Sequence, residues 1–252
     1  MQSPKTVYFL SKISPDISSA INSTWPYPIY SSEPNLRAVA CFTKINKDLR
    51  PFTYRKKTLI IVSLTGTVMY HFTCNDHDYL YTGKLCITSN ILNSSYIKDL
   101  GEKEQIDTLI CDSSIIDVPV DFNVQNAADK IESIIRNYSN MKIVISMDTF
   151  GMEDLLFEIA CRGYSVYTGC SRNAFLRIQN ADSYFTTSRD AVLRVVNKAF
   201  CVNIDDCYRR YMNKNIITII PSAKYSVKEM LDLRKVGVHI VNYEDRSTAQ
   251  AL

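Results

Sequence analysis

The sequence predicts a mixed α/β protein, and three observations carry this prediction. Short runs of β-branched and aromatic residues dominate the first third of the chain, which indicates strands. Apolar residues then recur at helical spacing. From there, segments typical of strands and helices alternate, an order that favours a parallel α/β unit. At 252 residues the chain is long enough for one large domain or two modest ones.

The first third is expected to form a β-rich unit, because turn-forming residues separate its extended runs. The turns fall at Leu64-Thr-Gly-Thr and at Cys74-Asn-Asp-His-Asp, which indicates a meander. A further strand, Thr108–Cys111, ends at the polar sequence Asp112-Ser-Ser. The strands expected before it are Thr6–Leu10, Pro28–Ser31, Ala38–Phe42, Thr58–Leu64, Thr67–Phe72 and Tyr79–Tyr81.

The remainder of the chain is expected to alternate helices and strands. An amphipathic helix begins at Val124 and ends near Asn140, because its apolar residues share one face. A helix from Ser226 to Arg234 begins with a capping box, since Glu229 follows Ser226 at the required spacing. The other expected elements are a strand at Lys142–Ser146, a helix from Gly151, and strands at Gly163–Tyr167, Ile216–Ile220 and Val238–Val241.

The composition excludes several classes of protein. Apolar residues make up 46% and charged residues 22%, the balance of a soluble globular protein. No apolar run is long enough to span a bilayer and no signal peptide is visible, so neither a membrane partner nor secretion is expected. The eight cysteines stand singly, which favours reduced, mostly buried thiols in an intracellular protein. The net charge of +3 decides nothing about nucleic acid, because a binder would have to concentrate its charge locally.

A histidine-rich metal centre would have to be built from the three histidines of the chain, His71, His77 and His239. His71 and His77 flank Cys74 on an expected hairpin, which suggests a metal site. Because no fourth ligand has suitable spacing, one partly buried and one solvated histidine is the favoured interpretation. Four cysteines are likewise expected to be core thiols rather than a second zinc site: Cys161, Cys170, Cys201 and Cys207.

Several short blocks resemble, in chain order, motifs of the metallo-β-lactamase/β-CASP DNA-repair nucleases, the Artemis, Apollo and Pso-type family. The first resembles the family's metal loop F-L-S-H-x-H-x-D-H, and the fourth stands where the family carries Y-T-G-D. The blocks span most of the chain, and their shared order carries the resemblance. They are Tyr8-Phe-Leu-Ser-Lys-Ile-Ser-Pro-Asp-Ile, Ile29-Tyr-Ser-Ser, Gly66-Thr-Val-Met-Tyr-His-Phe, Tyr81-Thr-Gly-Lys, Thr108-Leu-Ile-Cys-Asp-Ser-Ser, Gly151-Met-Glu-Asp-Leu-Leu-Phe-Glu-Ile-Ala, Phe185-Thr-Thr-Ser-Arg-Asp-Ala-Val-Leu-Arg and Tyr225-Ser-Val-Lys-Glu-Met-Leu.

The resemblance implies a metallo-β-lactamase-like αββα sandwich with a small inserted α/β domain of the β-CASP type. Residues 1–115 and 212–252 would form the metallo-β-lactamase-like domain, and residues 116–211 the insertion. The family's role is DNA end processing, end joining and interstrand cross-link repair in the nucleus, with zinc as the metal. A nuclear location is expected on this ground, and a cytoplasmic one otherwise.

Most metal-ligand positions of the family are replaced in this chain. The third metal motif falls near Val62–Leu64, where no histidine exists, and the fourth, an aspartate in the family, is Lys84. A lysine ammonium repels a dication, and its charge reverses that of the missing carboxylate. The four ligand positions of the first metal loop read Lys12, Ser14, Asp16 and Ile17.

Two carboxylates remain at the family's positions, Asp16 and Asp112, and these are the candidate catalytic residues as vestiges of a metal site. The histidine positions of the β-CASP motifs align with Arg194 and Ser222. Asp16 is equally explained as a helix N-cap after Pro15. An isolated pair of carboxylates could hold Mg²⁺ weakly through water, but not the dinuclear zinc of the family. We therefore expect zinc to be lost and no other cofactor to be bound.

Basic residues provide the candidate binding sites. Lys12 and Lys84 would both point into the former metal pocket and attract phosphate without cleaving it. Loss of metal followed by drift is the alternative. Two denser clusters with interleaved tyrosines could meet a nucleic-acid backbone and stack bases, or could be solvated loops. They are Arg55-Lys56-Lys57 beside Tyr54, and Arg209-Arg210 between Tyr208 and Tyr211.

The sequence thus predicts a protein of the DNA-repair nuclease family that has lost zinc-dependent nuclease activity. It would act as a pseudonuclease that binds DNA or a DNA-repair partner. The alternative is an active 5′–3′ DNA exonuclease or endonuclease with unconventional metal ligands. A third interpretation is a shortened gene product.

Overall fold

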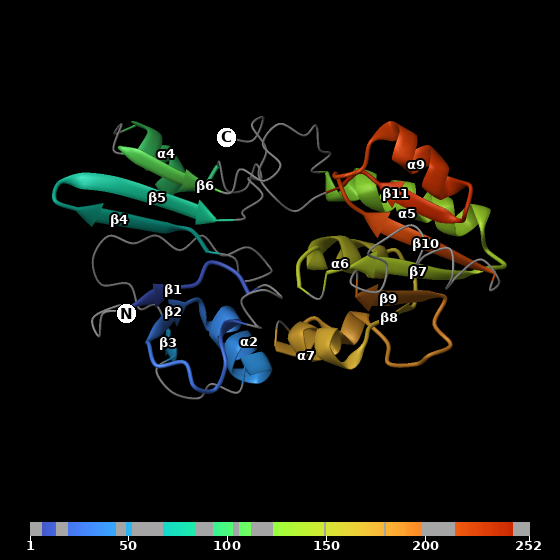
Figure 1. The fold of residues 1–252 in the computed structure, drawn as a ribbon, viewed down its shortest axis with the longest axis horizontal. Helices are drawn as coiled ribbons and strands as arrows, with labels where there is room; N and C mark the ends of the chain where they lie inside the picture. The colour runs from blue at the N-terminus through green and yellow to red at the C-terminus, as the bar shows by residue number, and fades with distance from the viewer. Residues whose placement is uncertain are drawn as a thin grey trace. The chain divides into compact units, whose positions relative to one another are not determined.

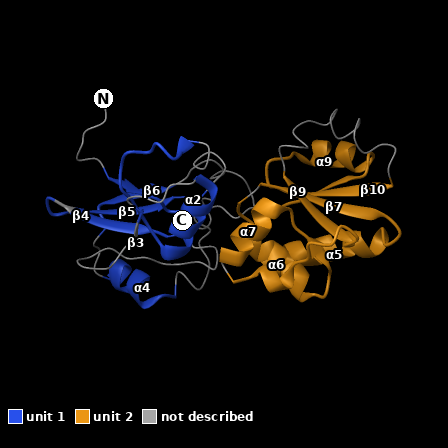
Figure 2. Cartoon of the chain, turned by 90° about the horizontal axis from the view of Figure 1, so that it is seen from below, with its two compact units in different colours: residues 1–117, 245–252 blue, residues 118–244 orange. Residues whose placement is uncertain are grey.

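The computed structural model of the chain divides into two compact units. Unit 1 comprises residues 1–117 and 245–252, and unit 2 comprises residues 118–244 (Figure 2). Both units contain strands and helices, so the predicted mixed α/β class is confirmed and is consistent with a metallo-β-lactamase-like α/β fold. The structure describes residues 7–13, 20–43, 49–51, 68–83, 93–102, 106–111, 123–148, 150–178, 180–197 and 215–243.

Unit 1 begins with a three-stranded parallel sheet (Figure 1). The chain order of its strands is also their spatial order, and the register pairs Tyr8 with Ile29. The centres of the predicted strands Thr6–Leu10 and Pro28–Ser31 are confirmed. The strands are β1 (Tyr8–Phe9), β2 (Ile29–Ser31) and β3 (Leu49–Pro51).

The segment after β2 is helix α2 (Glu33–Thr43), so the strand predicted at Ala38–Phe42 is wrong. Pro34 stands in the first turn, where a helix tolerates a residue without an N–H. The run of apolar residues suggested a strand, but its buried members repeat at three and four residues and therefore lie on one helical face. These buried residues are Asn35, Leu36, Ala38, Val39 and Thr43.

The second sheet of unit 1 contains an antiparallel hairpin, β4 and β5, with β6 paired in parallel to β5. Asn75 and Asp76 form the hairpin turn with φ of +50° and +63°, the left-handed conformations of a two-residue type I′ turn. The turn predicted after Cys74 is thus confirmed. The predicted strand Thr58–Leu64 lies outside the described residues. The elements are β4 (Tyr70–Cys74), β5 (His77–Gly83), helix α4 (Ser95–Glu102) and β6 (Thr108–Cys111), of which α4 was not expected.

Unit 2 is built on a five-stranded parallel sheet with the order β11-β10-β7-β9-β8. Helices α5 and α6 lie on one face of this sheet and α9 lies on the other (Figure 2). The predicted parallel α/β unit is therefore confirmed, together with the capping box of α9. The elements are α5 (Val124–Asn137), β7 (Lys142–Met147), α6 (Glu153–Cys161), β8 (Val166–Tyr167), α7 (Cys170–Ile178), the 3-10 helix η1 (Asp182–Tyr184), β9 (Leu193–Asn197), β10 (Ile216–Pro221), α9 (Val227–Arg234) and β11 (Val238–Val241).

The compact units have a different C-terminal boundary from the predicted domains. The sequence assigned residues 212–252 to the same domain as the first third of the chain. In the structure, residues 215–243 extend the sheet of unit 2, because β10 pairs with β7 from Ile216 opposite Lys142 to Ile219 opposite Ile145. The assignment of residues 116–211 to an insertion of the β-CASP type stays a prediction.

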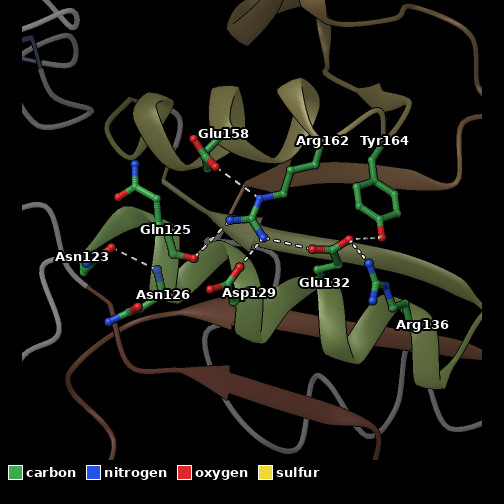
Figure 3. Close-up of polar contacts among 9 residues, drawn as sticks. All are labelled: Asn123, Gln125, Asn126, Asp129, Glu132, Arg136, Glu158, Arg162 and Tyr164. Atoms are coloured by element: carbon green, nitrogen blue, oxygen red, sulfur yellow. Dashed lines mark hydrogen bonds and ion pairs between the residues drawn. The ribbon is translucent and has the colours of Figure 1, made fainter.

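A network of ion pairs joins α5 to α6 on the surface of unit 2 (Figure 3). The guanidinium of Arg162 donates hydrogen bonds to Asp129 at 2.6 Å, to Glu132 at 3.0 Å and to Glu158 at 3.2 Å. Glu132 also accepts a hydrogen bond from Tyr164 at 3.2 Å. Beneath the network, the two helices and the sheet share one core cluster that is almost completely buried. None of the described helices is long and apolar enough to cross a bilayer.

Candidate functional site

The segment after β1, here called the β1 loop (residues 10–13), contains the first of the predicted site residues, Lys12. The loop continues the path of β1 beside β2, because the Leu10 N–H donates to the Tyr30 carbonyl at 2.9 Å. Leu10 and Ile13 are buried, whereas the Lys12 side chain is only partly covered. The β1 loop is therefore held to the sheet by its apolar residues and carries its cation at the surface.

The Leu10 carbonyl is fixed by two buried hydroxyls. The Ser31 hydroxyl donates to it from the end of β2, and the Tyr70 hydroxyl donates at 2.8 Å from β4. Burial raises the pKa of Tyr70 to about 12, although hydrogen bonds to Ser31 and Leu10 act in the opposite direction. Tyr70 is therefore a neutral donor at physiological pH.

The Ser11 carbonyl is fixed in the same way by two N–H donors. The Val68 N–H donates to it at 2.8 Å and the Asn35 side-chain amide at 3.0 Å. Asn35 lies in the first turn of α2 and is 1% exposed. The Leu10 and Ser11 carbonyls are thus both engaged by neutral donors.

Gly83, at the end of β5, packs against the β1 loop. Its φ is +57°, and a Cβ added to it would lie 2.7 Å from the Ser11 hydroxyl. This contact brings the Tyr81-Thr-Gly-Lys block to the β1 loop, and the Ser31 bond brings the Ile29-Tyr-Ser-Ser block there. Three sequence blocks of the resemblance therefore meet at one place in unit 1, and two of them, the Tyr8 and Tyr81 blocks, stand at metal motifs of the family. Below, the β1-loop support means Ser31, Asn35, Tyr70 and Gly83.

The described part of this site does not fit a zinc ion. Zinc in proteins takes imidazole, thiolate or carboxylate ligands. The β1 loop offers Ser11 and Lys12, and its support offers hydroxyls, an amide and a glycine. No group of three or more histidine, cysteine, aspartate or glutamate side chains is placed to hold a metal anywhere in the described residues. Among these residues, the chemistry open to the site is that of a cation on a rigid loop.

Most of the other predicted site residues lie outside the described residues. This holds for both candidate catalytic carboxylates, for the second pocket lysine and for both basic clusters. The positions are Asp16, Asp112, Lys84, Arg55, Lys56, Lys57, Arg209 and Arg210, with the replaced ligand positions Ser14 and Ile17. Their proposed roles therefore stay predictions.

The histidines of the hairpin are not placed to share a metal ion with other described side chains. His71 is 4% exposed, and its ring nitrogens are hydrogen-bonded to the Tyr96 hydroxyl at 2.7 Å and to the Asp78 carboxylate at 3.0 Å. His77 is exposed and faces Asp107 at 3.7 Å. The sequence favoured one partly buried and one solvated histidine; His77 is solvated as expected, and His71 is more completely buried than expected.

The cysteines differ from the sequence expectation. Of the four whose side chains are described, Cys41, Cys161 and Cys170 are exposed, and Cys111 is intermediate. Cys161 and Cys170 are therefore not core thiols, because they stand on the solvent sides of the ends of α6 and α7. Cys201 and Cys207 lie outside the described residues.

Arg194 and Ser222 both lie in unit 2 but are not brought together. Arg194 lies on β9 and pairs with Val144 of β7. Its guanidinium carbon is 5.2 Å from the centre of the Tyr167 ring. Ser222 is fully buried and follows β10, on the opposite side of β7. Since two strand spacings and about four residues of strand length separate them, they cannot form one site.

A buried ion pair at the start of α6 was not foreseen from the sequence. Arg172 and Glu153 are 6% and 4% exposed, and their charged groups lie 3.4 Å apart. Glu153 also accepts the Gly151 N–H at 2.7 Å, and Arg172 donates to the Asp148 carbonyl. Burial lowers the pKa of Arg172, while attraction to Glu153 and Asp148 counteracts this. The Gly-x-Glu spacing of the Gly151 block was visible in the sequence, but its arginine partner was not.

Comparisons with known proteins bear on the β1 loop and on the fold. No protein-family model matches the chain. The zebrafish (Danio rerio) 5′ exonuclease Apollo is 26% identical over 271 aligned positions, which cover 98% of this chain. The chain spans 45% of the length of that relative. The match supports the resemblance that the sequence blocks indicate.

A solved structure shares the fold. It is the crystal structure of a protein of unknown function from Enterococcus faecalis V583, with a TM-score of 0.60 and 13% sequence identity. The alignment covers 98% of this chain and 71% of the bacterial one. At this identity the likeness concerns the fold alone.

Proposed function

We propose that the chain is a member of the metallo-β-lactamase/β-CASP DNA-repair nuclease family that binds nucleic acid or a repair partner without zinc-dependent cleavage. The observation that carries the proposal is Lys12, a cation at the first metal-ligand position, on a loop whose carbonyls are held by neutral donors. The similarity to a 5′ exonuclease over 98% of the chain supports the family.

The chemical reason is the replacement of ligands by cations. Hydrolysis on zinc needs a metal-bound water and a stabilised phosphorane charge, and both depend on a dication held in fixed geometry. Lys12 and Lys84 stand at two ligand positions of the family in the sequence and would bring positive charge there without the metal. An ammonium binds phosphate through charge-assisted hydrogen bonds but activates no water. The proposed outcome is retention of a phosphate or backbone without turnover.

Zinc content tests the loss of metal. The full chain, saturated with zinc and then desalted, should carry well under one zinc per molecule. The matched control is the triple variant Lys12→His, Ser14→His and Ile17→His, which restores the H-x-H-x-D-H pattern and should carry more zinc than the unchanged chain. One tightly bound zinc in the unchanged chain would refute the proposal.

The competing function is an active 5′–3′ nuclease with unconventional ligands, favoured by the two retained carboxylates Asp16 and Asp112. Single-stranded 5′-phosphorylated DNA, incubated with the chain and Mg²⁺ or Zn²⁺, should remain uncut. Turnover that disappears in both Asp16→Ala and Asp112→Ala would establish the competing function instead.

Filter binding of the same DNA tests the role of the lysines. The double variant Lys12→Glu plus Lys84→Glu should bind more weakly and with a smaller salt dependence, because phosphate contacts release counterions. The control is Lys98→Glu plus Lys228→Glu, an equal charge change at exposed positions on α4 and α9. Equal losses in the two variants would show that total charge, and not this site, sets the affinity.

The remaining parts of the proposal follow from the family. DNA is the proposed partner, with a repair protein as the alternative. The basic clusters Arg55-Lys56-Lys57 and Arg209-Arg210 are proposed to contact the backbone. A nuclear location is proposed on the same ground.

A further inference from the structure

A pocket of about 400 Å³ lies within unit 2, between helices α5 and α9 and strand β11. Among the described strands, β11 is an edge strand of the sheet, and its only neighbour in the strand order is β10. Helices α5 and α9 lie on opposite faces of the sheet (Figure 2), and side chains from both helices line the pocket. The volume falls within the range of small-molecule sites in proteins.

The walls of the pocket are mainly apolar. Ile134 of α5, Met230 of α9 and Ile240 of β11 are among the apolar residues that line it. Leu231 also lines the pocket and is 57% exposed, so a large apolar side chain is left in contact with solvent. Removal of such apolar surface from water by a ligand lowers the free energy and favours binding.

A buried imidazole forms the polar part of the pocket. His239 is 7% exposed, and its Nε2 has no hydrogen-bond partner in the described part of the chain. The Tyr138 ring, which also lines the pocket, packs edge-to-face against the imidazole at 5.2 Å. A buried polar atom without a partner costs free energy, and a ligand that pairs with it removes that cost.

Two cations, Lys130 of α5 and Arg234 of α9, are among the residues that line the pocket. No acidic side chain is among the residues that line the pocket. Arg234 also forms no ion pair with the described residues. The pocket therefore combines the guanidinium of Arg234 with apolar side chains and the imidazole of His239.

We propose that this pocket binds a small organic anion with a flat apolar body. The apolar body would lie against Leu231 and Ile134, its acidic group would face Arg234 and Lys130, and His239 would hydrogen-bond to it. The pocket shares no residue with the β1 loop, so the proposal goes beyond the nucleic-acid function and does not depend on it.

Anilinonaphthalenesulfonate is a suitable probe, because it combines a sulfonate with an aromatic body and fluoresces in apolar surroundings. The full chain should bind one molecule, measured by fluorescence and calorimetry. Arg234→Glu should weaken binding about tenfold or more, because it removes a charge-assisted contact and adds repulsion. N-phenylnaphthylamine has the same body without the sulfonate, and its affinity should be unchanged by Arg234→Glu but reduced by Leu231→Ser.

Lys228→Glu is the matched control, since Lys228 is exposed on the same helix and does not line the pocket. It should leave the affinity for both probes unchanged. Equal weakening by Lys228→Glu and Arg234→Glu, or several equivalent sites per chain, would overturn the proposal. Failure of the unchanged chain to bind the probe, when a cooperative thermal transition shows that it is folded, would overturn the proposal as well.

Discussion

At the scale of single residues, the candidate site owes its geometry to side chains that the sequence blocks did not mark as functional. Ser31, Asn35 and Tyr70 come from three different elements, and each donates to a carbonyl of the β1 loop. The sequence could predict Lys12 at the family's ligand position. It could not predict these donors, because a hydrogen bond between residues 60 positions apart, such as that from Tyr70 to Leu10, depends on the tertiary fold.

Substitution of Gly83 tests how closely β5 approaches the β1 loop. Gly83→Ala places a Cβ 2.7 Å from the Ser11 hydroxyl at a φ of +57°. We expect the free energy of unfolding to fall by about 1–3 kcal/mol, from backbone strain and the contact together. Urea unfolding monitored by circular dichroism measures this change.

The control for Gly83→Ala is Gly101→Ala in helix α4. An added Cβ at Gly101 would meet no atom within 4 Å. Alanine has a higher helix propensity than glycine. The free energy of unfolding of this variant should therefore rise by about 0.5–1 kcal/mol. A loss at Gly101 as large as that at Gly83 would contradict the specific approach to Ser11.

His239 is expected to make stability depend on pH. Burial lowers its pKa, and repulsion by Arg234 adds to this effect. The unfolded chain then binds more protons than the folded chain below about pH 6.5, the ordinary pKa of histidine. The contribution of His239 is therefore present above that pH and is lost as the pH falls.

The measurement compares urea unfolding of the unchanged chain and of His239→Gln across this pH range. The unchanged chain should lose more stability on acidification than the variant. Arg234→Gln should remove the smaller part of the difference, since burial is the larger cause. Equal pH dependence in the unchanged chain and in His239→Gln would show that protonation of His239 does not destabilise the folded chain.

At the scale of elements, periodicity predicted those helices and strands whose burial is one-sided. The helix at α5 was foreseen because Ala127, Ile131 and Ile135 share a buried face. Ala38–Phe42 was mistaken for a strand because a short apolar run fits either period, and the proline in the first turn of α2 lies outside the run. Strand β9 was not predicted, since it begins within the Phe185 block and its burial depends on β7 and β8 on either side.

The ion network between α5 and α6 is expected to stabilise their packing (Figure 3). Arg162→Ala removes three carboxylate contacts and a bond to the Gln125 carbonyl at 3.3 Å from a side chain that is 19% exposed. The three carboxylates would then lie near one another without their shared cation. We expect a clear loss of unfolding free energy and a lower Tm, measured by calorimetry.

Arg177→Ala is the comparison for Arg162→Ala. The pair of Arg177 with Asp182 is exposed, at 73% and 37%, and contributes at most about 1 kcal/mol. The Tm of this variant should stay close to that of the unchanged chain. If the two arginine variants lose the same stability, the network adds nothing beyond an ordinary surface pair.

At the scale of the whole molecule, the parallel sheet of unit 2 is completed on one side by strands from the end of the chain. The central strand β7 has β9 on one side and β10 on the other. The order of elements was predictable, because parallel strands need helical connections. The lateral order was not, since the sequence does not show which strands lie on either side of β7. The boundary at residue 211, taken from the resemblance, therefore differs from the end of unit 2 at residue 244.

Two fragments distinguish these boundaries. Residues 118–244 contain all five strands and the core cluster, including Ile217 and Ile219 of β10. We expect this fragment to unfold cooperatively and to give dispersed amide signals in NMR spectra. Residues 116–211 lack β10, α9 and β11, so that one edge of β7 and the face beneath α5 lose their partners. Unpaired strand edges and exposed apolar faces favour aggregation. The shorter fragment should therefore aggregate or unfold without a cooperative transition, and if it folded as well as the longer one, β10 and β11 would not be integral to unit 2.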